Sequence, residues 1–143
     1  MISLLILIPF VCAPAVLLPV GKMFRVRLLC AVSVAHAVIV ASFWRRLPMA
    51  EFNGYLVLDP LGLLFLSMIS FLFVMVSIFM LGYFRHEQRN GQIFIACLLV
   101  ILSTMTLVAV SYHFGLLWVA IETTTLFSAP LISFHYRKES LEA

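Results

Sequence analysis

Apolar residues fill five long stretches of the chain, and short polar segments separate these stretches from one another. Each stretch holds about 17–23 residues, close to the roughly 20 that a helix needs to cross the hydrocarbon core of a bilayer. The sequence therefore predicts an all-α fold, a polytopic bundle of transmembrane helices. The expected spans are residues 2–20, 28–44, 61–83, 93–111 and 114–134.

The composition agrees with a lipid environment. Hydrophobic residues make up 64% of the 143 residues and charged residues only 10%, whereas soluble domains carry about 25% charged residues. No shift in composition marks a second domain, so we expect residues 1–143 to form a single transmembrane domain embedded in the lipid bilayer. The net charge of +3 reflects the placement of loop charges, and we expect no binding to nucleic acid.

The distribution of Lys and Arg among the loops predicts an orientation. Cytoplasmic loops of membrane proteins carry an excess of these residues. Only Arg45 and Arg46 lie on one side of the five expected spans, and seven basic residues lie on the other. The N-terminus is therefore expected outside and the C-terminus in the cytoplasm. The seven are Lys22, Arg25, Arg27, Arg85, Arg89, Arg137 and Lys138.

Glu122 is the one charged residue in the fifth expected span. Glu122 lies about 12 Å from Phe114 along the axis of the expected helix, which places it well inside a hydrocarbon core about 30 Å thick. An acid at that depth costs about 2.5–3.5 kcal/mol, so we expect it to face protein or water and to relay protons. Thr123–Thr125 supply hydroxyls at the same depth, and Pro130 frees the carbonyl of Leu126. The alternative is a structural glutamate that bonds to a neighbouring helix.

Asp59 and Pro60 begin the third expected span with the chemistry of a helix N-cap. An aspartate accepts hydrogen bonds from the free N–H groups of the first turn, and proline is favoured at the first helical position. We therefore interpret Asp59 as a structural cap. Further along, Ser67, Ser70 and Ser77 share one face, which favours hydrogen bonds to a neighbouring helix.

The remaining polar residues in the spans give no cofactor site. His36 is the only histidine placed deep in a span, so a bis-histidine haem, which needs two rings at one depth on facing helices, is poorly supported. We interpret His36 as a hydrogen-bonded residue of the bundle, with a role in a proton path as the alternative. The three cysteines form no CxxC pair, and no metal-ligand cluster or phosphate loop appears. We expect no cofactor, no metal and no catalytic residue.

Two segments resemble a known family. The segment Trp118–Pro130, WVAIETTTLFSAP, with Ser140–Ala143 after a short basic loop, resembles the antiporter-like membrane subunits of complex I and energy-converting hydrogenases, and is most similar to those of the hydrogenase-4 type. Leu58–Phe65, LDPLGLLF, resembles the start of that family's third helix. The five spans match the family's N-terminal portion in order and spacing.

The resemblance implies a non-catalytic subunit of a multisubunit oxidoreductase in a bacterial or archaeal cytoplasmic membrane. Its other hydrophobic subunits would be the partners, and it would contribute to redox-coupled proton or sodium translocation. In that family the acid matched by Glu122 pairs with a lysine on a later helix, and no Lys lies inside a span of this chain. Either another chain supplies the Lys-bearing helices, as we expect, or the chain is a structural remnant, or the sequence is a fragment. The alternatives are a structural, non-conducting subunit of such a complex, and an electron-transfer or quinone-binding anchor.

Overall fold

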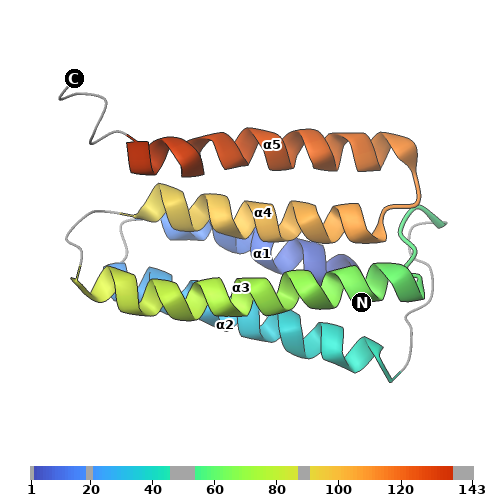
Figure 1. Ribbon diagram of the computed structural model, residues 1–143, viewed down its shortest axis with the longest axis horizontal. Coiled ribbons are helices and arrows are strands. Elements are labelled where there is room, and N and C mark those ends of the chain that lie inside the picture. Colours follow the sequence, from blue (N-terminus) through green and yellow to red (C-terminus); the bar gives the residue numbers. More distant parts are fainter. Residues whose placement is uncertain (1, 19–20, 46–53, 87–90, 137–143) are drawn as a thin grey trace.

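A computed structural model gives the fold, and it describes residues 2–18, 21–45, 54–86 and 91–136. Five helices run back and forth along one long axis (Figure 1). They are α1 (Ile2–Leu17), α2 (Lys22–Phe43), α3 (Pro60–His86), α4 (Gln92–Val110) and α5 (Phe114–Tyr136).

Four of these helices, α2 to α5, are long and apolar enough to cross a membrane. The described part of α1 has 16 residues, fewer than the roughly 20 of a typical span. The start of α2 differs from the expectation, because the helix begins at Lys22 and includes Arg25 and Arg27. The first turns of α2 thus extend beyond its apolar stretch.

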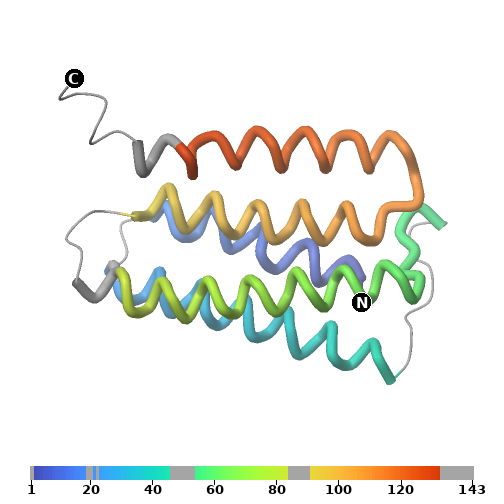
Figure 2. Tube along the Cα trace, viewed as in Figure 1, coloured from blue at the N-terminus to red at the C-terminus, as the bar shows by residue number. Residues whose placement is uncertain are grey.

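Helix α4 lies at the centre of the arrangement and α5 at its edge (Figure 2). Helices α1 and α5 both pack on α4, while α2 and α3 form a second closely packed pair that also contacts α4. Within their apolar windows, 61% of α4 is buried but only 6% of α5. Among the described residues, α5 therefore packs against one helix alone and leaves most of its surface uncovered.

Two apolar clusters form the core, and a polar layer lies between them. One cluster gathers near the α1–α2 connection and includes Val16, Leu29 and Leu99. The other includes Leu5, Leu66 and Val110, toward the opposite ends of the same helices. The polar layer consists of His36 in α2, Ser70 in α3 and Thr106 in α4. Each of these buried residues lies between the parts of its helix that belong to the two clusters.

A short backbone pairing closes the end of the bundle opposite the α1–α2 connection. The amide of Val57 donates to the carbonyl of Val110 at 2.9 Å, and the amide of Tyr112 donates to the carbonyl of Tyr55 at 3.0 Å. These bonds tie the segment that precedes α3 to the α4–α5 connection. They also give hydrogen-bond partners to backbone N–H and C=O groups, which the hydrocarbon of a bilayer cannot provide.

Gly62 and Gly82 stand at opposite ends of α3 and offer a matched test of packing. A Cβ on Gly62 would lie 2.6 Å from Asp59 Oδ1 and 2.8 Å from the carbonyl oxygen of Ala109, whereas a Cβ on Gly82 would meet nothing within 4 Å. We expect Gly62→Ala to lower the free energy of unfolding by about 1–3 kcal/mol and Gly82→Ala to raise it by about 0.5–1 kcal/mol. Unfolding in mixed micelles measures both, and equal effects would contradict the close α3–α4 approach.

Candidate functional site

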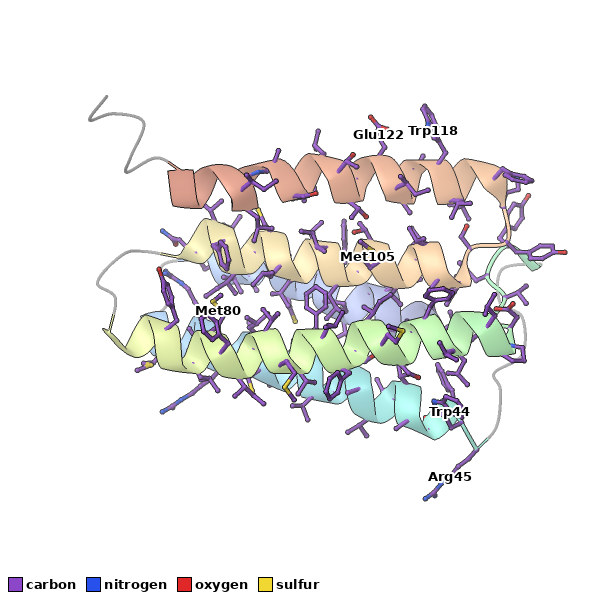
Figure 3. The ribbon with its side chains drawn as sticks, viewed as in Figure 1. Trp44, Arg45, Met80, Met105, Trp118 and Glu122 are labelled. Atoms are coloured by element: carbon purple, nitrogen blue, oxygen red, sulfur yellow. The ribbon has the colours of Figure 1, made fainter. Side chains whose placement is uncertain are left out.

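Glu122 lies on the outer face of α5, away from the other four helices (Figure 3). Trp118, one turn earlier, points in the same direction and is 69% exposed. No hydrogen bond or ion pair joins the Glu122 carboxylate to any residue that the structure describes. The acid therefore stands near the middle of an apolar helix and faces outward from this chain.

The neighbours of Glu122 along α5 are also uncovered. Gly115, Thr125 and Ala129 lie on the same side, and all three are exposed. Pro130 lies within the helix, which continues to Tyr136. Small residues let another helix approach closely in a membrane, so this face has the composition of a helix–helix contact.

The three consecutive threonines do not surround the carboxylate. Thr123 Oγ1 donates to the carbonyl of Val119 at 2.7 Å, and Thr125 Oγ1 donates to the carbonyl of Glu122 itself at 2.7 Å. Thr124 turns the other way and donates to Thr104 Oγ1 of α4 at 3.0 Å. The middle threonine thus fixes α5 on α4, and this contact sets the outward direction of Glu122.

His36 is placed quite differently, in the polar layer between the two apolar clusters. The ring is 3% exposed. Its Nδ1 lies 2.9 Å from Ser70 Oγ of α3, and its Nε2 lies 2.9 Å from Thr106 Oγ1 of α4. One side chain from α2 therefore links two other helices.

The two hydroxyls constrain the protons of this ring. Ser70 Oγ lies 2.8 Å from the carbonyl of Leu66, and Thr106 Oγ1 lies 2.7 Å from the carbonyl of Leu102. If both hydroxyls donated to these carbonyls, both ring nitrogens would have to be donors and His36 would be charged. The apolar stretches of α1, α3 and α4 contain no charged residue to balance such a charge.

We therefore expect a neutral His36, with one ring nitrogen donating and the other accepting. In either tautomer one hydroxyl turns its proton from its own helix to the ring. The hydrogen-bond chain therefore runs from that hydroxyl through the ring to the other hydroxyl and ends on the carbonyl of the latter's own helix. The small cavity beside His36 is lined by apolar residues of α1 and α2. This geometry is that of a link between helices.

Helix α4 carries a set of hydroxyls that sequence reasoning missed. Ser103 Oγ donates to the carbonyl of Ile6 in α1 at 2.8 Å, three residues before Pro9, which lies inside that helix. Thr104 bonds to α5 and Thr106 to α2. Three hydroxyl residues among four positions of the most buried helix are the signal that could have revealed these contacts.

The remaining candidates lie at the ends of helices. Asp59 Oδ1 accepts a hydrogen bond from the amide of Gly62 at 2.7 Å in the first turn of α3. His113 Nδ1 accepts from the amide of Gly115 at 3.2 Å at the start of α5, with the Tyr55 ring 5.0 Å away. Among the described residues, no group of three or more His, Cys, Asp or Glu side chains could hold a metal.

We compared the chain with protein-family models, with curated proteins and with solved structures, and none of them matches. The geometry of Glu122 and of the polar layer is therefore what a functional assignment has to start from.

Proposed function

We propose that this chain is a membrane subunit of a complex I-like or energy-converting hydrogenase-like assembly, in which Glu122 takes part in redox-coupled translocation of protons or sodium ions. The observation that carries the proposal is the lone carboxylate on the outer face of α5, near mid-span and without a partner among the described residues. Acids in such positions mark ion pathways in membrane proteins. The resemblance of the segment Trp118–Pro130 to antiporter-like subunits supports the same role.

The physical requirement is a partner helix. A carboxylate left in lipid costs about 2.5–3.5 kcal/mol, and none of the described residues offers a partner to it on the exposed face of α5. A helix bearing a Lys, Arg or His at the depth of Glu122 would stabilise the charged carboxylate, and withdrawal of that cation would favour protonation. Movement of the partner's cation away from Glu122 and back would thus protonate and deprotonate the carboxylate. The redox chemistry would reside in other subunits.

A structural, non-conducting subunit is the second candidate, and the polar layer favours it. The hydroxyls of α4 and His36 join all five helices through hydrogen bonds that end within the bundle. In that case Glu122 would serve only to attach a neighbouring helix. Both candidates place the chain in a membrane, with its N-terminus outside as the Lys and Arg distribution predicts.

Two exposed alanines test whether the outer face of α5 is the contact surface. Ala129 lies two turns beyond Glu122, and Ala35 is an exposed residue of α2. We expect Ala129→Trp to abolish co-purification of other hydrophobic subunits in mild detergent, because the indole would hold the partner helix away. Ala35→Trp serves as the control and should co-purify as the wild type does. Undisturbed assembly with Ala129→Trp would contradict a partner on this face.

A further inference from the structure

Arg25 lies at the end of the bundle where α1 leads into α2, and no carboxylate among the described residues pairs with it. Its side chain is only 6% exposed. Nη2 donates to the carbonyl of Leu18 at 3.1 Å, and within the described part of the chain Nε is buried with no hydrogen-bond partner. A guanidinium has five N–H donors, and a buried cation held by a neutral carbonyl alone is costly. An anion nearby would offset that cost.

The start of α2 adds positive potential at the same place. Gly21 is the N-cap of this 22-residue helix, and no side chain caps the free amides of the first turn. A helix N-terminus attracts anions, phosphate groups above all. Because Arg25 bonds to Leu18, three residues before Gly21, its guanidinium lies beside that N-terminus.

An apolar cavity lies toward the same end of the bundle. It has a volume of about 440 Å³, lies between α1, α4 and α5, and is lined by Leu17, Ile93, Phe127 and other almost entirely apolar residues. Leu17 directly precedes Leu18, whose carbonyl accepts the hydrogen bond from Arg25. Its apolar lining suits a hydrocarbon chain, and the buried cation at the same end of the bundle favours a lipid with an anionic headgroup.

We propose that an anionic phospholipid binds at this end of the bundle. Its phosphate group lies against Arg25 and the N-terminus of α2, and one acyl chain enters the cavity between α1, α4 and α5. Basic pockets between transmembrane helices on the cytoplasmic side bind such headgroups in other membrane proteins, and the Lys and Arg distribution predicts that side here. Glu122 is not among the residues that line the cavity, and the proposal does not depend on its role.

Native mass spectrometry of the full chain in detergent tests the proposal. The chain is titrated with dioleoyl phosphatidylglycerol, with dioleoyl phosphatidylcholine, and with glycerol 3-phosphate as a headgroup without chains. We expect the wild type to bind phosphatidylglycerol about tenfold more tightly than the other two ligands. Arg25→Gln should lose about tenfold in that affinity, as expected for a charge-assisted contact.

Arg27→Gln is the matched control, because Arg27 lies two residues further along α2 and is exposed. It should bind phosphatidylglycerol as the wild type does, and Arg25→Lys, which keeps the charge, should retain the lipid preference. Equal losses in Arg25→Gln and Arg27→Gln would overturn the proposal, because they indicate a diffuse surface charge. Equal binding of phosphatidylglycerol and glycerol 3-phosphate would overturn it as well, because the cavity would then take no part. Should Arg25→Gln fail to fold, equal binding of the two phospholipids by the wild type would still overturn it.

Discussion

Replacement of His36 by alanine is expected to lower the free energy of unfolding by about 2–4 kcal/mol. The substitution removes a buried ring, leaves a cavity, and breaks the hydrogen bonds to Ser70 and Thr106. Ser42→Ala is the control on the same helix, because the Ser42 hydroxyl is exposed and bonds only to the carbonyl of Ile39. That variant should differ from the wild type by less than about 0.5 kcal/mol. Reversible unfolding in mixed micelles measures both.

A double-mutant cycle separates the hydrogen bond from the packing of the ring. Thr106→Val keeps the shape of the side chain and removes its hydroxyl, so the cycle of His36→Ala with Thr106→Val isolates the coupling across α2 and α4. Interhelical hydrogen bonds in membranes give about 0.6 kcal/mol on average and about 1.7 kcal/mol at most. We expect a coupling in that range. A coupling of zero, with both single variants near wild-type stability, would mean that the polar layer does not hold the bundle together.

Hydropathy predicted five helices, and four of them are long and apolar enough to cross a membrane. The prediction works because lipid imposes one requirement on every span. Each backbone group inside the membrane must be satisfied within its own helix, so about 20 apolar residues indicate one helix. The method gave the wrong start for α2, since it treats Lys22, Arg25 and Arg27 as loop residues while the helix already includes them. Basic residues lower the local hydropathy and so end the apolar stretch, but the helix continues through them.

The side of α5 on which Glu122 lies could not be predicted. Apart from this acid, the hydroxyl residues and His135 near its end, the helix is apolar all round, so its periodicity does not indicate which face packs on α4. We expected Glu122 inside protein, and within this chain it is exposed because Thr124, two residues later, bonds to Thr104. Serine and threonine hydroxyls look alike in a sequence whether they bond to their own helix or to another, and the contacts of Ser103 and Thr106 were missed for this reason.

The outward face of α5 leads to the prediction with the largest effect on function. Glu122→Gln retains the size and hydrogen-bonding capacity of the side chain but cannot take up or release a proton. If Glu122 relays protons, this variant should assemble normally and lose coupled ion movement by at least about a hundredfold, the scale of effect for a group that transfers protons. Glu122→Asp keeps a titratable group and should retain partial activity.

Asp59→Asn is the matched control for the loss of a carboxylate. It makes the same chemical change at the start of α3, and asparagine caps a helix about as well as aspartate does. This variant should retain ion movement and stability, since its role in the structure is the hydrogen bond to Gly62. A comparison of the two variants therefore distinguishes a relay at Glu122 from a general effect of removing negative charge.

The most direct test is substrate-driven proton uptake by inverted membrane vesicles that contain the assembled complex with either the wild-type chain or Glu122→Gln. We predict that the wild type and Asp59→Asn acidify the vesicle interior at similar rates, and that Glu122→Gln fails to do so although the complex is present in equal amount and still oxidises its substrate. Full proton uptake with Glu122→Gln would contradict the account, and Glu122 would then be a structural residue of a non-conducting subunit.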